Sequence, residues 1–361
     1  MLELTSKIYR LGEIIHGSEK EKKALKMIKD SLEFDEGISI RQLPVNTKEW
    51  AIKFQKLLIN NKEVEDFTLF PYSRGSVKGR VGSNILQFSF PNHPFKVKDL
   101  YKVAIEQGAE ALIFYENSLK RRITLGDVNI PILMIPQKLE KGTVIEIEAE
   151  SELKDTISYN LEVELREGKD DYILIGAHID HWLTGYHDNL FSVDTLLSLI
   201  YSKEIMVRNH GMKVVFFSSE EGPRCCAGSF QYPKDGVSIA IVLDALFPNR
   251  VVFSAIPSLW DFSKYFKLKR IEMPTPFSDH FSFIQHGIPA VVLYNDDLIP
   301  YYHSDRDVEF NEDEQYKLSI IGSLRKMLEE VDKHSVDELR LNKFGTNKIL
   351  PDYVNLTSMF G

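Results

Sequence analysis

Five residues whose side chains commonly bind metal ions lie at or just beyond the ends of apolar segments. They are His178, Asp188, Glu221, Asp244 and His303. Such segments are typical of buried parallel strands, and open α/β sheets bind ligands at the carboxyl ends of their strands. The apolar segments cover residues 172–180, 213–221, 238–246 and 290–297. The sequence therefore predicts that His, Asp and Glu side chains meet along one edge of a sheet.

The charges of this set suit two divalent cations. Two histidines, two aspartates and one glutamate supply three negative charges against the four positive charges of two such ions. A bridging hydroxide would bring the cluster to neutrality and allow it to be partly buried. A single His or Asp at a strand end is more often a turn or capping residue. The joint pattern, however, predicts a metal site.

The order of these residues resembles peptidase family M28, which comprises dinuclear zinc aminopeptidases and carboxypeptidases. The resemblance covers roughly the first 35 residues and then residues 158–330. Its motifs are His178-Ile179-Asp180, Gly185-Tyr186-His187-Asp188-Asn189, Glu220-Glu221, Asp244, Ser278-Asp279-His280 and Tyr302-His303-Ser304-Asp305-Arg306-Asp307. Each motif alone is weak, but the set is specific. The resemblance implies a mixed, largely parallel central sheet flanked by helices.

The resemblance also implies how the five ligands are shared between two zinc ions, with cobalt or manganese as alternative metals. Asp188 would bridge both metals. His178 and Asp244 would complete one site, and Glu221 and His303 would complete the other. The resemblance further implies a cis peptide bond between Asp188 and Asn189.

Three further residues are candidates for chemistry. Adjacent residues of an extended chain point in different directions, so Glu220 can face a metal-bound water while its neighbour binds metal. Glu220 would then act as the general base that activates this hydroxide. Asp180, on the same side of the chain as His178, is placed to accept the free imidazole N–H. Tyr302 is a candidate for stabilising the oxyanion, with a packing role as the alternative.

Composition limits the class of protein. A chain of 361 residues with 43 % hydrophobic content can bury a large core, and its length predicts one sizeable domain plus a smaller one. The formal charge of −9 argues against nucleic-acid or anionic-membrane partners. No apolar stretch is long enough to span a membrane, and the first residues lack the pattern of a signal peptide. We therefore expect a cytoplasmic protein, and leave a homo-oligomer open.

The chain divides into a predicted peptidase domain and an insertion. Apolar positions at helical spacing predict two helices over residues 5–33, the second starting with a capping box at Ser18 and Glu21. The insertion has a predicted helix at 98–110 and strands at 111–117, 130–136 and 143–150, an order that resembles the protease-associated domain. A last helix is predicted at 316–331. The expected division is a catalytic domain over 1–42 and 153–332, a small α/β insertion over 43–152 and a C-terminal tail over 333–361.

The only two cysteines, Cys225 and Cys226, are adjacent. A disulfide between neighbouring residues is uncommon, so we expect a reduced pair, in keeping with a reducing compartment.

These observations predict a zinc-dependent exopeptidase acting on peptide substrates, with an aminopeptidase favoured. A carboxypeptidase, a dipeptidase or a glutaminyl-cyclase-like enzyme on the same scaffold are the enzymatic alternatives. All five ligands are present, which favours two metals and disfavours the mononuclear cyclase branch. A non-catalytic peptide-binding relative is the alternative from another class.

Overall fold

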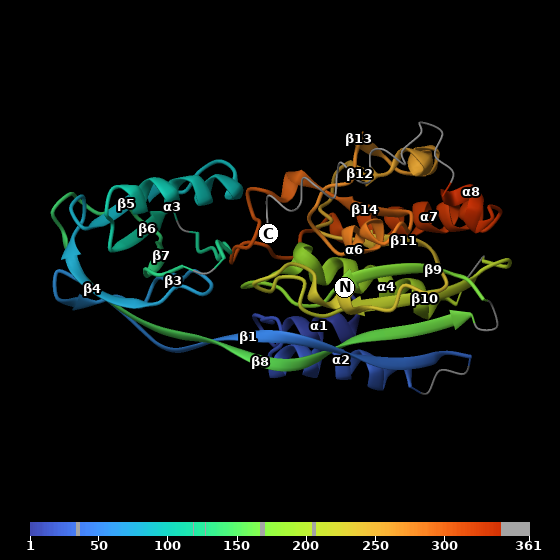
Figure 1. Cartoon of the computed structure of the whole chain (residues 1–361), viewed down its shortest axis with the longest axis horizontal. Coiled ribbons are helices and arrows are strands. Elements are labelled where there is room, and N and C mark those ends of the chain that lie inside the picture. The colour runs from blue at the N-terminus through green and yellow to red at the C-terminus, as the bar shows by residue number, and fades with distance from the viewer. Residues whose placement is uncertain (34–36, 118, 127, 167–169, 204–206, 341–361) are drawn as a thin grey trace.

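The computed structural model describes residues 1–33, 37–117, 119–126, 128–166, 170–203 and 207–340. The chain folds into a large lobe and a small lobe joined by two long antiparallel strands, β1 (Ser39–Ile59) and β8 (Val144–Arg166), as Figure 1 shows. These strands pair along almost their whole length. The predicted domain boundaries, at residues 42/43 and 152/153, therefore fall inside continuous strands that enter both lobes.

A mixed sheet runs through both lobes in the order β13-β12-β14-β11-β9-β10-β8-β1-β2. At its small-lobe end, β2 pairs with the end of β1 and β4 pairs with the start of β8 (Figure 1). Its other strands are β2 (Lys62–Glu63), β4 (Gly75–Arg80), β9 (Tyr172–His178), β10 (Gly211–Phe217), β11 (Val237–Leu243), β12 (Val251–Ala255), β13 (Leu268–Glu272) and β14 (Ala290–Tyr294). The four central strands, β14, β11, β9 and β10, are mutually parallel. The predicted mixed α/β fold is confirmed.

Helices cover both faces of this sheet, which explains why its central strands are apolar throughout. Residues of β9, β10 and β11 that share one face pack in a core with α1, α2, α4 and α7, and those on the other face pack with α6. The helices are α1 (Glu3–Tyr9), α2 (Glu19–Leu32), α4 (Phe191–Ser202), α5 (Ala227–Gln231), α6 (His280–Gln285), α7 (Asp313–Val331) and α8 (Val336–Arg340). Shorter helical turns are η2 (Tyr186–Leu190), η3 (Pro257–Tyr265) and η4 (Asp296–Leu298).

The small lobe contains a second sheet of order β3-β7-β6-β5 with one helix. Its elements are β3 (Thr68–Leu69), β5 (Ile85–Ser89), η1 (Pro94–Lys96), α3 (Val97–Glu106), β6 (Ala111–Tyr115) and β7 (Ile132–Ile135). Helix α3 ends earlier than predicted because the chain turns at Gly108, whose φ of 74° favours glycine. The predicted strand at 143–150 is the start of the much longer β8.

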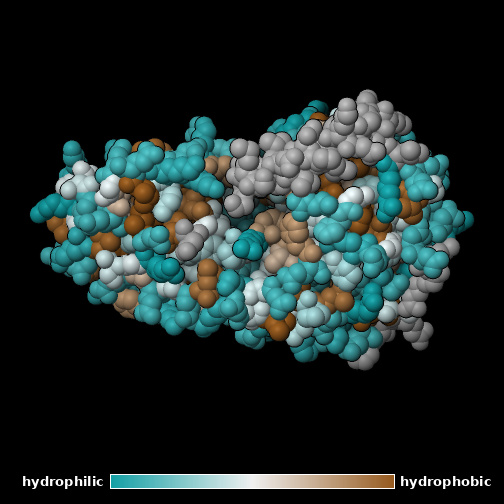
Figure 2. All heavy atoms as spheres, viewed as in Figure 1, coloured by the Kyte–Doolittle hydropathy of each residue, from teal (hydrophilic) through white to brown (hydrophobic). Residues whose placement is uncertain are grey.

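The C-terminal tail predicted for 333–361 begins with α8, and residues 341–361 lie outside the described residues. Within the described ranges, no helix combines the length and apolar character needed to cross a bilayer. The visible face of the molecule is mainly hydrophilic, with hydrophobic side chains in small groups (Figure 2).

Candidate metal centre and active site

The sheet brings the five predicted ligands to one edge. His178 is the last residue of β9, Asp244 follows β11, and Glu221 lies four residues beyond the end of β10. Asp188 lies in η2, which leads into α4, and His303 lies in the loop beyond β14 and η4. Because β10, β9, β11 and β14 are parallel neighbours, their carboxyl ends meet on the same side.

The five side chains form two groups that share Asp188. His178 Nε2 lies 3.4 Å from Asp188 Oδ1 and 3.2 Å from Asp244 Oδ1. His303 Nε2 lies 3.3 Å from Asp188 Oδ2 and 2.7 Å from Glu221 Oε1. Ligands of one tetrahedral Zn²⁺, with bonds of about 2.0–2.2 Å, lie about 3.4 Å apart. The donor atoms and their spacing thus fit two divalent metal ions, one for each group.

The remaining ring nitrogens fix the orientation of both imidazoles. His178 Nδ1 donates to the carbonyl oxygen of Asp180 at 2.9 Å, and His303 Nδ1 donates to that of Arg122 at 3.1 Å. A carbonyl oxygen only accepts, so each Nδ1 carries the proton and each Nε2 faces the carboxylates. The buried His303 Nε2 faces only the carboxylate oxygens of Asp188 and Glu221 among the described polar contacts. This is the arrangement that a metal-binding imidazole requires.

The carboxylates that face the two imidazoles favour positive charge at both rings. Burial alone would lower the pKa of both histidines, but the facing carboxylates outweigh it. They raise the pKa of His178 well above its ordinary value and that of His303 to about 10. Burial would raise the pKa of Asp188, yet hydrogen bonds from both imidazoles hold it well below the usual range. Positive charge is therefore favoured at both places where the groups converge.

Two buried carboxylates hold the loop that carries the Glu pair. Asp180 accepts the backbone N–H groups of Glu220 at 3.0 Å and Glu221 at 2.9 Å, and Glu21 accepts that of Ser219 at 2.7 Å. Asp180 thus differs from its predicted role: its carboxylate lies 3.7 Å from His178 Nδ1, and its backbone carbonyl receives that proton instead. Both carboxylate oxygens accept N–H groups of the loop, so the carboxylate mainly holds the Glu pair.

Sequence reasoning missed two residues that orient the ligands. Trp182 Nε1 donates to Glu221 Oε2 at 3.0 Å, which leaves Oε1 to face His303. Asp307, noted only as part of a motif, accepts the backbone N–H of Asp188 at 3.0 Å. The predicted cis peptide bond between Asp188 and Asn189 is confirmed. A tryptophan four residues beyond a ligand histidine was the only sequence signal for Trp182.

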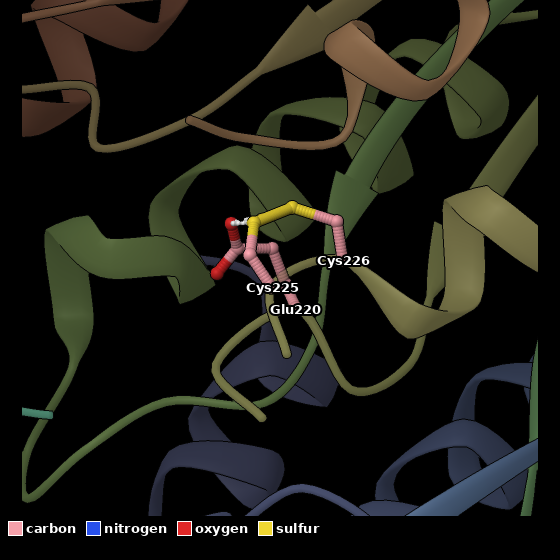
Figure 3. Close-up of side chains that lie close together, drawn as sticks. All are labelled: Glu220, Cys225 and Cys226. Carbon is pink, nitrogen blue, oxygen red and sulfur yellow. Dashed lines mark hydrogen bonds between the residues drawn. A yellow bond between two sulfur atoms is a disulfide. The ribbon is translucent and has the colours of Figure 1, made fainter. Parts of the chain in front are cut away.

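The expectation of a reduced cysteine pair is wrong, because Cys225 and Cys226 form a disulfide in the structure. Cys226 has a φ of 72°, and its N–H donates to the carbonyl of Glu220, so the loop folds back on itself. The two sulfur atoms lie 3.2 and 3.3 Å from Glu220 Oε1, as Figure 3 shows. The disulfide therefore forms one side of the environment of Glu220. Burial raises the pKa of Glu220 well above its ordinary value.

The ligands open into a cavity of about 410 Å³, a volume within the usual range for small-molecule sites. Glu220 and Tyr302 line the cavity, and the Tyr302 ring stacks on His303 with centroids 3.7 Å apart. Of the Ser278-Asp279-His280 motif, Ser278 lines the cavity, whereas Asp279 and His280 are fully buried and do not. Burial raises the pKa of Asp279 to about 7 and lowers that of His280 to about 3.

The small lobe supplies one wall of this cavity. His93, Pro94 and Phe95 line it from η1, opposite Phe277 and Tyr294 of the large lobe. The Phe95 and Phe277 rings lie 5.1 Å apart, and both side chains are substantially exposed, at 56 % and 47 %. The lobes therefore meet across the cavity mouth through an aromatic pair.

Comparison with known proteins agrees with the geometry. Residues 160–320 match peptidase family M28. The fold is similar to that of the peptidase M28 precursor from Shewanella amazonensis SB2B (18 % identity, 92 % of this chain and 94 % of that chain, TM-score 0.68). It is also similar to the zinc aminopeptidase from Bacillus subtilis (14 % identity, 93 % and 96 %, TM-score 0.67). A third similar structure is the aminopeptidase from Aneurinibacillus sp. strain AM-1 (19 % identity, 89 % and 92 %, TM-score 0.59).

No curated protein matches the chain in sequence. At these identities the likeness to solved structures concerns the fold. The family match begins at residue 160 and so leaves the nature of the insertion untested. The five ligand positions all lie within the matched residues. Residues 160–320 are thus similar to peptidase family M28, and the chain shares its fold with the zinc aminopeptidase and the other structures named above.

Proposed function

We propose that the protein is a dinuclear zinc aminopeptidase that releases N-terminal residues from short peptides. The observation that carries this proposal is the shared carboxylate of Asp188, whose two oxygens face the imidazoles of two separate ligand groups. The M28 match over the same residues supports peptide hydrolysis as the reaction.

The bound metals would supply Lewis acidity, lowering the pKa of a water molecule and polarising the scissile carbonyl. Glu220 lines the cavity beside the ligands, where its carboxylate would take the proton of the attacking water and deliver it to the leaving amine. Asp180 would position Glu220 by holding two consecutive N–H groups. Tyr302 would donate its hydroxyl proton to the developing oxyanion.

The charges of the cavity favour an aminopeptidase over a carboxypeptidase. Its described lining includes five carboxylates but a single arginine, Arg270. That guanidinium is already engaged: Nη1 donates to Asp296, and Nε donates to Glu272 at 2.7 Å. A substrate carboxylate would therefore find no unengaged arginine among the described lining residues, which disfavours a carboxypeptidase. The apolar wall made by Phe95, Phe277 and Val292 suits an uncharged side chain.

A panel of chromogenic substrates tests this proposal. With zinc or cobalt added, we expect release of the chromophore from aminoacyl derivatives with a free amino group. The same derivatives with a blocked amino group should be poor substrates, and peptides that report on C-terminal release should not be cleaved. Preference for N-blocked substrates would contradict the aminopeptidase assignment. If the protein bound two metals but cleaved no peptide, the alternative of a non-catalytic peptide-binding protein would be favoured.

The first prediction concerns metal stoichiometry. We expect two divalent ions per chain, because the three negative charges of the ligand set exceed the charge of one divalent ion, and one of the two ligand groups would stay empty. Equilibrium dialysis against zinc, followed by elemental analysis, measures the number. Saturation at one ion under excess zinc would contradict the dinuclear site.

A second prediction is that the insertion shapes substrate choice but supplies no metal ligand or proton-transfer group. His93 is the only histidine in residues 43–152, and it lines the outer cavity beside Phe95, with ring centroids 5.0 Å apart. His93→Ala should leave metal content unchanged and alter turnover of a small aminoacyl substrate by less than about tenfold, or roughly 1.4 kcal/mol in barrier. Loss of a bound metal in this variant would place the insertion among the ligands.

A further inference from the structure

A short segment of the insertion, residues 119–122, lies directly against the loop that carries His303. The two segments are joined through their backbones. Arg122 N donates to His303 O at 3.0 Å, and Asp305 N donates to Lys120 O at 3.1 Å. Arg121 and Ser304 form an isolated β-bridge between these hydrogen bonds. The proton on His303 Nδ1 is received by this same segment, at the carbonyl oxygen of Arg122.

The side chain of Arg121 holds the preceding part of that loop. It is 2 % exposed, and its guanidinium donates to the carbonyl oxygens of Tyr302 at 2.8 Å and Pro300 at 2.6 Å. Glu116 balances its charge through two hydrogen bonds, at 2.7 and 3.1 Å. The planar fork of arginine can satisfy several acceptors at once, whereas a lysine ammonium offers a single point. Arg121 therefore ties the backbone of residues 300–302 to the small lobe.

The side chain of Arg122 anchors the same segment to the peptidase domain through Glu13. Its guanidinium forms two hydrogen bonds to Glu13, at 2.6 and 3.1 Å, and Glu13 also accepts the N–H of Leu183 at 3.0 Å. Glu13 precedes α2, and Leu183 follows the His178 motif. The Arg122 carbonyl that receives the His303 proton is thus held in a network connected to the peptidase domain.

We propose that Arg121 and Arg122 are positioning residues for His303. The insertion would then be a structural part of the metal site formed by Asp188, Glu221 and His303. This inference rests on the proposed function only in assuming that His303 binds a metal. It follows from the contacts that orient the imidazole: the insertion supplies the acceptor for Nδ1 and fixes the loop on both sides of the ring. Loss of such orienting partners typically weakens metal binding by about 10–100-fold.

Arg121→Met tests the proposal, with zinc and cobalt binding as the readout. Methionine keeps an unbranched, largely aliphatic stem but cannot donate to the loop carbonyls. Calorimetric titration, together with the visible absorption of bound cobalt, should resolve two ions in the wild type. We expect affinity for one ion to fall by about 10–100-fold and affinity for the other to change by less than about threefold. His303→Ala identifies the weakened site, because it removes a ligand from that group alone.

Arg80→Met is the matched control. Arg80 also lies in the small lobe and donates to a backbone carbonyl, that of Gly142 at 3.0 Å, but it is exposed and does not line the cavity. The Arg80→Met variant should bind both ions with wild-type affinity. Should Arg121→Met fail to fold, Arg121→Lys keeps the charge beside Glu116 and is expected to weaken the same ion by about threefold or more.

Wild-type affinity for both ions in a folded Arg121→Met or Arg121→Lys protein would overturn the proposal. Equal weakening of both ions would also overturn it, because that result would indicate a general effect of docking the two lobes. Neither result depends on hydrolysis. A wild type that binds two ions but cleaves no peptide would refute the proposed function and leave this inference testable.

Discussion

Replacing Asp188 with alanine is expected to abolish metal binding and peptidase activity together. Both carboxylate oxygens of Asp188 face ligand groups, at 3.4 Å from His178 Nε2 and 3.3 Å from His303 Nε2. Without this side chain each group keeps only one imidazole and one carboxylate, which is fewer than the three protein ligands usual at a catalytic zinc. Elemental analysis after dialysis, together with turnover of an aminoacyl substrate, measures both effects on one preparation.

Asp155→Ala provides the control for this experiment. Asp155 is an exposed aspartate that pairs with Lys48 at 2.7 Å, far in sequence from every ligand, so its loss should change neither metal content nor turnover. If Asp188→Ala kept one ion at wild-type affinity, the two groups would not share this carboxylate. If it kept both ions, Asp188 would not be a ligand at all.

The meeting of the five candidate ligands at one sheet edge was predictable because it follows from local patterns in the sequence. Apolar segments predict buried strands, parallel strands end on one side, and the ligands follow those ends at His178, Glu221 and Asp244. The sequence does not contain the distances between them. It does indicate which edge of the sheet they occupy. Side chains that share this edge can then come close enough to bind the same ions.

Contacts between distant segments were not predictable in the same way. His303 and the Arg122 carbonyl are separated by 181 residues, and any residue type can supply a backbone carbonyl. The identity of the residue at position 122 therefore gives no sign that its backbone carbonyl orients His303. The domain boundaries stay a prediction for a related reason. Strands β1 and β8 continue through both lobes, and a long strand has no composition change where it leaves one core and enters the next.

Glu21 shows where local reasoning was right but incomplete. The capping box predicted Ser18 as the cap, and Ser18 does accept the N–H of Glu21 at 3.2 Å. The carboxylate of Glu21, however, reaches the N–H of Ser219 at 2.7 Å and that of Gly17 at 2.9 Å. Helix α2 thus supports the Glu220 loop, a role that depends on tertiary packing and that helix periodicity alone does not specify.

Replacing Glu220 with glutamine is expected to lower kcat by about 10²-fold or more while both metals stay bound. The general-base role accounts for the loss: an amide cannot take the proton of the attacking water, and loss of such a group costs about 2.7 kcal/mol or more in barrier. Metal binding should persist because the two groups that share Asp188 do not include Glu220, and its backbone stays tied to Asp180. KM should change little, since glutamine keeps the size of the side chain that lines the cavity.

The neighbouring Glu221→Gln variant separates chemistry from metal binding. Glu221 Oε1 faces His303 at 2.7 Å, so this variant should lose affinity for one ion and lose activity with it. Activity of Glu221→Gln should recover at raised zinc concentration, because the defect is in occupancy. Activity of Glu220→Gln should not recover, because its metals are already bound and the missing proton acceptor cannot be replaced by more metal. Near-normal turnover of Glu220→Gln would show that another group takes the proton, and the cavity-lining carboxylates would then have to be tested in its place.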